Sequence, residues 1–286
     1  MSAPTVGFIG LGNMGGELAN NLVKHGLSVV AHDAAGPDRV PAGAVAGTDV
    51  ADVARQADVI VLSLPDGKVS EIVVREILGA ADRRTAHIID TSTTGVGAAR
   101  RIEALLAEHG VGYVDAPVSG GTAGARARTL MVMYAGSDEA CASIEAVLAG
   151  LSDRNRRVGD RPGMAQALKL ANNFLSATAL AATSEAIAFG LSVGLDLKTM
   201  LDVMSASSGA NTATTDKFPN HVLTGTYASG FANSLMSKDI NLFLDSVREQ
   251  GTPAEVGELT AAIWARFAAA EPGVDFTRIF PFVEGS

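Results

Sequence analysis

The sequence predicts an α/β domain with a doubly wound, mostly parallel sheet, followed by a second domain built only of helices. Three observations in the 286 residues support this prediction. Short apolar strands alternate with helical stretches up to about residue 160. A glycine pattern lies between the first strand and the first helix, and no strand pattern appears after residue 162. Strands that alternate with helices of about 10 to 15 residues are typical of parallel sheets.

The elements of the first half follow one another closely. The first helix begins in the glycine pattern and ends at Gly26, because glycine is common directly after a helix. Further helices are expected at residues 49–57, 68–78 and 96–109. We expect strands at residues 5–9, 28–33, 59–64, 87–90, 112–116 and 130–134.

The pattern changes at Arg161-Pro162-Gly163. Residues 163–193 are apolar on almost all sides, so we expect a long helix buried between domains or subunits. Amphipathic helices are expected at 197–206, 234–250 and 254–270. The predicted domains are therefore residues 1–162, an α/β domain, and residues 163–286, a helical domain.

Composition excludes several classes of protein. The net charge of −9 argues against a nucleic-acid partner, and the basic run at 153–157 is expected to be a solvated turn. The single cysteine, Cys141, cannot form an intrachain disulfide, which fits a reducing compartment. We expect neither a signal peptide nor a membrane partner, and hence a cytoplasmic protein. The five histidines show no metal-ligand spacing, so no metal is expected.

The glycine pattern is Gly10-x-Gly12-x-x-Gly15, and it is the fingerprint of a dinucleotide-binding Rossmann domain. Gly10 permits a tight turn, Gly12 lets a pyrophosphate approach the backbone, and Gly15 lets the helix and strand pack closely. The helix N-terminus then offers N–H groups to the phosphates. The alternative is a glycine turn that binds nothing. The expected cofactor contacts in this segment are Gly10, Leu11, Gly12, Asn13, Met14 and Gly15.

Asp33 ends the second strand, 18 residues after Gly15. A carboxylate here accepts hydrogen bonds from the ribose hydroxyls and repels a 2′-phosphate, which favours NAD over NADP. NADP stays possible because Arg39 is close in sequence, and Asp33 could instead only cap a turn. Leu64 and Pro65 end the third strand and should border the cofactor at the carboxyl edge of the sheet.

Two polar loops also leave strands at this edge, where open α/β sheets bind ligands. Ser92 and Thr93 lie in the first loop, for which the alternative is a helix N-cap at Thr94. The second loop offers a hydroxyl and unobstructed N–H groups that suit a carboxylate, although it could be a loop without function. Its binding residues would be Ser119, Gly120 and Gly121.

Lys169 and Asn173 share one face of the long apolar helix, four residues apart. Burial is costly for an ammonium and lowers the pKa of a lysine, so a buried lysine can exchange a proton near neutral pH. The alternative is a lysine whose stem lies on the surface while its charge stays in water.

These motifs together, in this order, resemble the β-hydroxyacid dehydrogenase family, to which 3-hydroxyisobutyrate dehydrogenase belongs. The matching elements are the segment 7–15, the run 115–121, Gly163 with Lys169-x-x-x-Asn173, and Phe231 with Lys238-Asp239. The resemblance covers about residues 5–283. Arg128, where many members have glycine, and the segment 208–211 depart from the common pattern.

The resemblance implies an interdomain helix and NAD-dependent hydride transfer with a small 3-hydroxy acid or its semialdehyde. It implies that Lys169 is the general acid and base, helped by Asn173, that Ser119 to Gly121 bind the carboxylate, and that Ser92 and Thr93 line the nicotinamide side. Lys238 would close the cleft, and Phe231 and Lys238 would also contact the cofactor.

The expected assembly is a homodimer or homotetramer, because residues 163–193 carry much apolar surface. Two other functions are also consistent with the sequence. The enzyme could reduce a small aldehyde acid of the tartronate, succinic or glyoxylic semialdehyde type. It could also be a non-catalytic, nucleotide-sensing relative on the same fold.

Overall fold

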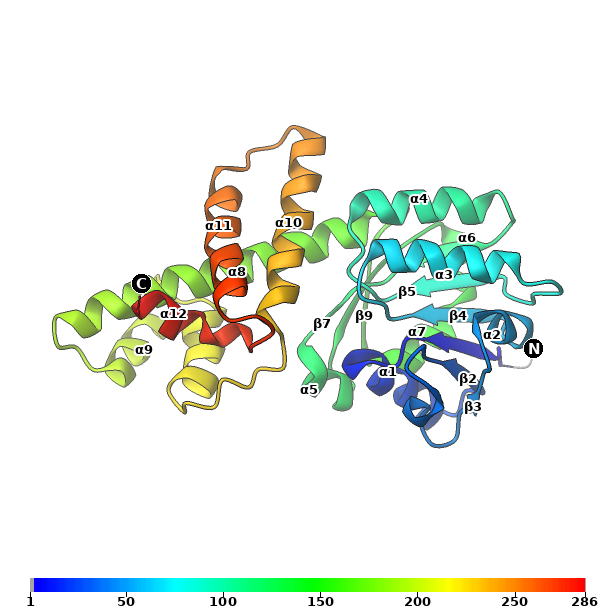
Figure 1. Cartoon of the computed structure of the whole chain (residues 1–286), viewed down its shortest axis with the longest axis horizontal. Coiled ribbons are helices and arrows are strands. Elements are labelled where there is room, and N and C mark those ends of the chain that lie inside the picture. The colour runs from blue at the N-terminus through cyan, green and yellow to red at the C-terminus, as the bar shows by residue number, and fades with distance from the viewer. Residues whose placement is uncertain (1–2, 286) are drawn as a thin grey trace. The chain divides into compact units, whose positions relative to one another are not determined.

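The computed structural model describes residues 3–285 and divides into two compact units, Met1–Lys169 and Leu170–Ser286. The first unit holds a sheet with helices on both faces, and the second is helical (Figure 1). The division falls inside one long helix, α8, whose first residues belong to the sheet unit.

The described part of the sheet unit confirms the predicted fold class. Six parallel strands follow the order β3-β2-β1-β4-β5-β6, which is the doubly wound arrangement. Strand β8 runs antiparallel to β6 and β7, and β9 runs parallel to β8. The strands are β1 (Val6–Ile9), β2 (Val29–His32), β3 (Val45–Ala46), β4 (Val59–Leu62), β5 (His87–Asp90), β6 (Gly112–Asp115), β7 (Val118–Ser119), β8 (Met131–Ala135) and β9 (Arg154–Gly159).

Two apolar layers cover the two faces of this sheet. Alternate residues of β4 point to opposite layers, Val61 to the side of α1 and α7, and Ile60 to the side of α2, α3 and α4. Both side chains are fully buried. The helices of this unit are α1 (Asn13–Lys24), α2 (Val50–Gln56), α3 (Gly67–Gly79), α4 (Val96–Ala107), α5 (Gly121–Arg126), α6 (Asp138–Ser143) and α7 (Glu145–Leu151), with a 3-10 turn η1 (Pro37–Arg39).

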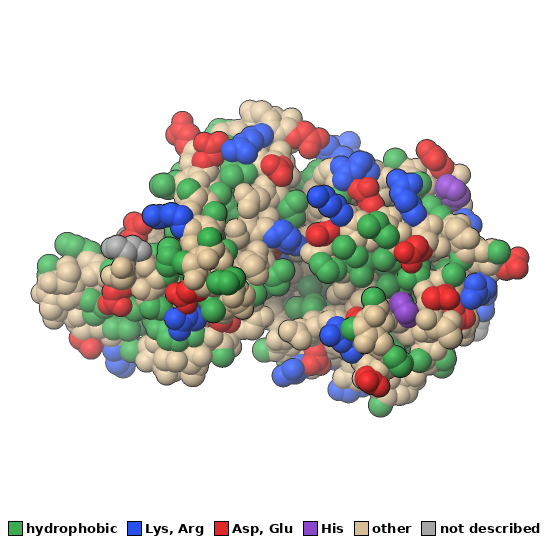
Figure 2. Space-filling model, in the orientation of Figure 1, with side chains coloured by type: hydrophobic (Ala, Val, Ile, Leu, Met, Phe, Trp, Pro, Cys, Tyr) green, Lys and Arg blue, Asp and Glu red, His purple; other side chains and the backbone are tan. Residues whose placement is uncertain are grey.

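The basic run corrects one prediction. Residues 154–159 form strand β9 and not a turn, because β8 offers an edge with which this segment pairs. Its arginine side chains nevertheless face solvent, and Arg157 forms an ion pair with Asp138 at 2.6 Å. On the face drawn in Figure 2, basic and acidic side chains are interspersed.

The helical unit has more elements than the sequence predicted. The expected long helix and three amphipathic helices are present with ends within about two residues, whereas η2, η3 and α12 were missed. The π-helix η2 contains Pro219, which disguises a helical pattern. The elements are α8 (Met164–Ser192), α9 (Leu197–Ser205), η2 (Ala213–Val222), α10 (Asn233–Gln250), α11 (Glu255–Ala270), the 3-10 turn η3 (Phe276–Arg278) and α12 (Ile279–Glu284).

Within the single chain, helix α8 is buried along one side and exposed along the other. Leu175 is 66% exposed and Phe189 is 71% exposed. An 18-residue window of α8 has a mean hydropathy of 1.4, which by length and composition alone would suffice to cross a membrane. Core helices of soluble proteins show the same property, and the first turns of α8 are hydrogen-bonded to loops of the sheet unit.

Candidate active site

The glycine turn between β1 and α1 has the geometry of a dinucleotide site. Gly10 has a φ of +94°, and a Cβ there would collide with the carbonyl oxygen of Ser63. A Cβ at Gly15 would collide with the Gly10 carbonyl oxygen, so both positions require glycine for packing. Gly12, by contrast, is exposed and has nothing within 4 Å of where its Cβ would stand. Together with the start of α1 at Asn13, which no side chain caps, this leaves backbone N–H groups for a pyrophosphate.

Asp33 lies directly after β2, and its carboxylate is contacted by two backbone N–H groups and one guanidinium. The N–H groups of Leu11 and Ala35 donate to its carboxylate at 2.6 and 2.8 Å, and the Arg39 guanidinium lies 3.5 Å away. Burial acts to raise the pKa of Asp33, but these N–H groups and the guanidinium outweigh it and hold that pKa below its usual range. The turn-capping alternative is therefore present in the structure, since the bond from Ala35 closes a local turn at Asp33.

A cavity of about 460 Å³ opens beside this carboxylate. Its volume lies in the range of small-ligand sites. The walls come from the segment after β2 and the segment around β3, including Asp33, Pro37, Val40, Gly47 and Thr48. The cavity, the anion-binding turn and Asp33 together fit a bound NAD or NADP.

The turn after β4 is tied to the loop after β5. The N–H of Leu64 donates to the Ser92 hydroxyl at 2.8 Å, and the Ser92 N–H donates to the buried Asp90 carboxylate at 2.9 Å. Burial raises the pKa of Asp90. Ser92 is only 4% exposed, whereas the neighbouring Thr93 is half-buried, so Ser92 frames the loop and Thr93 is the more accessible of the two.

The helix-cap alternative at Thr94 is wrong. Helix α4 is capped by Gly95, with a φ of +89°, and Thr94 makes no capping bond to it. The Thr94 and Gly95 N–H groups instead donate to the Gln166 side chain, at 3.0 and 3.2 Å. The loop is thereby fixed to the first turn of α8.

Ser119 ends the short strand β7, which pairs with β8 through Ser119 and Met131. Gly120 and Gly121 follow with φ of +133° and +67°. These positive angles turn the chain sharply from the strand into α5. The predicted carboxylate loop is therefore a structured turn, held in place by strand pairing.

The two departures from the family pattern have structural roles. Arg128 has a φ of +58°, which explains why glycine is usual at that position. Its guanidinium donates to the carbonyls of Ala149 and Gly150 at 2.7 Å, and so caps the end of α7. Asn211 accepts the N–H of Ala213 at 2.7 Å and thereby starts η2.

Lys169 is 7% exposed, so it is a buried lysine and not one that reaches the surface. One turn further along α8, the Asn173 amide donates to the Asp239 carboxylate at 2.6 Å. Asp239 is 2% exposed, and the Lys238 ammonium lies 3.3 Å from its other oxygen. Within the helical unit the structure therefore brings Asn173 and Lys238 to the same carboxylate.

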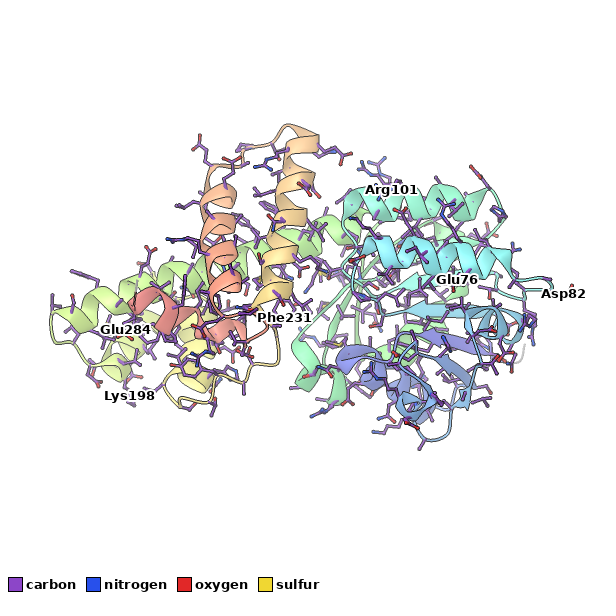
Figure 3. All side chains as sticks on the ribbon, in the orientation of Figure 1. Glu76, Asp82, Arg101, Lys198, Phe231 and Glu284 are labelled. Carbon is purple, nitrogen blue, oxygen red and sulfur yellow. The ribbon has the colours of Figure 1, made fainter. Side chains whose placement is uncertain are left out.

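Phe231 lies on the segment that leads into α10 (Figure 3). Its carbonyl accepts the N–H of Phe276 at 2.8 Å, and its ring packs edge-on against the Phe276 ring, with centroids 5.7 Å apart. Asp275 accepts bonds from Ser229 and Gly230 and holds the same segment. Phe231 is thus fixed relative to Lys238 by contacts inside the helical unit.

The sequence prediction gave no role to three buried polar residues next to its candidates, namely Asp115, Gln166 and Asp239. Spacing gave a signal for Gln166, which precedes Lys169 by one helical turn, and for Asp239, which follows Lys238 directly. Asp115 is fully buried and accepts the Gln166 N–H at 2.9 Å. Burial raises the pKa of Asp115 to about 7.

Comparison with known proteins agrees with this geometry. Residues 5–159 match the model of the NAD-binding domain of 6-phosphogluconate dehydrogenase. Residues 163–282 match the model described as NAD-binding of NADP-dependent 3-hydroxyisobutyrate dehydrogenase.

Several relatives are similar over nearly the whole chain. The 2-(hydroxymethyl)glutarate dehydrogenase of Eubacterium barkeri is 35% identical over 91% of this chain and 87% of its own. Human mitochondrial 3-hydroxyisobutyrate dehydrogenase is 33% identical over 99% and 87%. A solved structure of Mycobacterium tuberculosis 3-hydroxyisobutyrate dehydrogenase with L-serine superposes with a TM-score of 0.91, at 32% identity over 99% of both chains. The chain therefore belongs to the β-hydroxyacid dehydrogenase family of NAD(P)-dependent oxidoreductases.

Proposed function

We propose that this enzyme interconverts a small 3-hydroxy acid and its semialdehyde, with Lys169 as the general acid and base. The observation that carries this proposal is the burial of Lys169 one turn after Gln166, whose side chain is bonded to the loop at the carboxyl edge of the sheet. A buried amine beside a dinucleotide site is suited to proton transfer.

The names of the relatives define a substrate class. Hydroxyisobutyrate, hydroxymethylglutarate and serine each carry a primary alcohol on the carbon next to the one that bears a carboxylate. We propose 2-substituted 3-hydroxypropionates as substrates, in which the substituent is the variable part. Oxidation turns the CH2OH group into an aldehyde and releases one proton, and reduction reverses both changes.

In the proposed mechanism the chain holds the substrate and moves the proton. When bound, the nicotinamide supplies or accepts the hydride. Ser119, Gly120 and Gly121 hold the carboxylate, and Thr93 with Ser92 lines the side of the reacting carbon. Lys169 takes the proton of the hydroxyl in oxidation and returns it to the oxygen in reduction.

The helical unit would contribute the other substrate contacts. Asn173 would bind the substrate without adding charge, and Asp239 would fix its amide. Lys238 would close the site, and Lys238 and Phe231 would contact the cofactor.

We propose NAD as the preferred cofactor. The Asp33 carboxylate retains lone pairs for ribose hydroxyls beyond the Leu11 and Ala35 bonds, and its charge would repel a 2′-phosphate. Arg39, 51% exposed, lies close enough to offset part of that repulsion. We therefore expect NADP to be used as well, but less efficiently than NAD.

Two alternatives make different predictions. A reductase of succinic or glyoxylic semialdehyde would accept substrates without the 2-substituted CH2OH arrangement. A tartronate semialdehyde reductase forms 2,3-dihydroxypropionate and would instead prefer a hydroxyl to a carbon substituent at position 2. A non-catalytic, nucleotide-sensing relative would bind NADH without turnover, but buried Lys169 and Asn173 favour an enzyme.

The decisive experiment is a panel of 3-hydroxy acids and semialdehydes, assayed with NAD and NADP by absorbance of the reduced nicotinamide and without added metal. We expect 2-substituted 3-hydroxypropionates to give the highest kcat/KM. Equal activity on analogues that lack the carboxylate would remove the role of Ser119 to Gly121. NADH binding without turnover on any member of the panel would favour the sensing alternative.

We also propose a homodimer or homotetramer. Exposed apolar residues on α8 recur every seven residues, at Leu168, Leu175, Ala182 and Phe189. This heptad spacing is typical of helices that pair along one face. Light scattering at micromolar concentration should give a dimer or tetramer mass, and a monomer would contradict this proposal.

Location and domain limits are further proposals. A cytoplasmic location is supported by the single buried cysteine, Cys141, which fits a reducing compartment. We propose residues 1–162 and 163–286 as the domains, since β9 ends at Gly159 and α8 begins at Met164. Limited proteolysis with mass spectrometry would test these limits.

A further inference from the structure

Gln166 is a fully buried polar side chain for which the proposed reaction has no direct use. Its Oε1 accepts the N–H groups of Thr94 at 3.0 Å and Gly95 at 3.2 Å. Its Nε2 donates to the carbonyl of Ser92 at 3.0 Å. One planar amide therefore spans the backbone of the loop that carries Ser92 and Thr93.

The backbone of Gln166 is fixed as well. Its N–H donates to the Asp115 carboxylate at 2.9 Å, and Asp115 ends β6, next to β5 in the sheet. The first turn of α8 is thus held by one strand end through its backbone and by the neighbouring loop through a side chain. All of these atoms lie within the sheet unit.

Lys169 is three residues after Gln166, so the two side chains project from nearly the same side of α8, one turn apart. A rigid helix transmits the position of its first turn to the next one. Any rotation or slide of α8 that displaced Lys169 would break the bonds of Gln166 to the loop.

We propose that Gln166 is a positioning residue that sets the place of the Lys169 amine relative to the Ser92–Thr93 loop. This inference rests on the proposed role of Lys169. Capping the N-terminus of α4 would not require a buried Gln166 amide with three bonds, because an exposed Ser or Asp caps a helix equally well. Proton transfer does require it, because an error of about 1 Å in the position of a reacting group can reduce the rate about 10²-fold.

The test is a double-mutant cycle between Gln166 and Lys169. Gln166→Met keeps the length of the side chain and removes all three side-chain bonds. In the wild-type background we expect kcat to fall by about 10- to 100-fold, whereas KM and the affinity for NADH change little. In the Lys169→Ala background the same substitution should change kcat less than about twofold, because no amine remains to be positioned.

Gln56→Met is the matched control, because the Gln56 amide bonds Asp52 on α2 of the same unit. It should leave kcat unchanged. Gln166→Asn, which keeps the amide but is too short to span the loop, should lower kcat as Gln166→Met does. This variant also provides the measurement if Gln166→Met does not fold.

The outcomes separate the two proposals. Equal reductions of kcat by Gln166→Met in both backgrounds would show a purely structural effect and overturn the positioning role. An unchanged kcat in Gln166→Met and Gln166→Asn would do the same. Near-normal kcat in Lys169→Ala alone would instead overturn the proposed function of Lys169.

Discussion

The sheet unit and the helical unit bury their apolar side chains in different ways. Phe8 is the only one of the ten phenylalanines that lies before residue 170. The sheet layers consist mainly of Val, Ile, Leu and Ala, whereas the helical core is built around five rings, those of Phe218, Trp264, Phe267, Phe276 and Phe280. A regular sheet packs with branched residues of similar size, but irregularly crossed helices need large side chains to fill the space between them.

The two units also differ in how they bring their buried polar groups together. In the sheet unit, strand order gathers Asp90 and Asp115 at one edge, where they lie opposite each other in the β5–β6 register. In the helical unit, Asn173 on α8 and Asp239 on α10 form a pair between helices. A parallel sheet collects polar strand ends through its topology, whereas a helical unit needs individual residues at matching positions. Four substitutions can break or sharpen this comparison.

The largest expected effect is at Lys169, which ends the sheet unit. Lys169→Ala should lower kcat by about 10² to 10⁴-fold, as loss of a general acid and base does. NADH binding should persist, because the contacts proposed for the dinucleotide, at the glycine turn and Asp33, do not include Lys169. Lys169→Arg should restore little activity, since a guanidinium stays protonated.

Steady-state kinetics and NADH fluorescence measure both quantities. Lys198→Ala, which removes an exposed lysine paired with Asp202, is the control and should behave as wild type. If Lys169→Arg raised only KM, the lysine would be an electrostatic anchor for the carboxylate.

A second substitution tests whether the helical unit depends on its rings. Trp264 is fully buried, and its indole donates to the Ala177 carbonyl at 3.3 Å. Trp264→Ala should lower the free energy of unfolding by about 3 to 5 kcal/mol. Denaturant unfolding measures this. Ile72→Ala, at a residue 57% exposed on α3, should change it little, and a similar loss for both variants would contradict the comparison.

The third substitution tests the polar edge of the sheet. Because the pKa of Asp115 is raised to about 7, the unfolded chain ionises first as pH rises from about 4, and the folded state loses stability up to about pH 7. Asp115→Asn cannot ionise, so its stability relative to wild type should rise over this range. The upper limit is about 4 kcal/mol at ~1.36 kcal/mol per pKa unit.

Denaturant unfolding of both proteins at pH 5, 6, 7 and 8 measures this difference. Parallel stability curves for wild type and Asp115→Asn would show that Asp115 ionises normally in the folded protein.

The smallest expected effect concerns cofactor choice. Asp33→Ala should narrow the preference for NAD over NADP by about tenfold, or ~1.4 kcal/mol, because it removes both an acceptor for ribose and the repulsion of a 2′-phosphate. The ratio of kcat/KM with the two cofactors measures it. Asp38→Ala removes the same charge from an exposed neighbour and should leave the ratio unchanged. Wild-type preference for NADP would contradict the argument at Asp33.

The sequence determined the local features of this protein. The order of the main strands and helices and the glycine turn at Gly10 to Gly15 follow from hydrophobic periodicity and from steric needs of a few adjacent residues, whereas the residues alone left open whether Lys169 is buried. The start of α8 was also predicted from the sequence, because Pro162 and Gly163 interrupt the alternation of strands and helices just before it.

Tertiary structure alone decided which distant groups meet. Nothing local to Gln166 indicates that its amide binds Ser92, Thr94 and Gly95, 71 to 74 residues away. Strand β9 likewise forms only because β8 offers it an edge. Hydrogen bonds of buried polar groups depend on the partner that the fold supplies, and that partner is set by packing of the whole unit and not by neighbours in the chain.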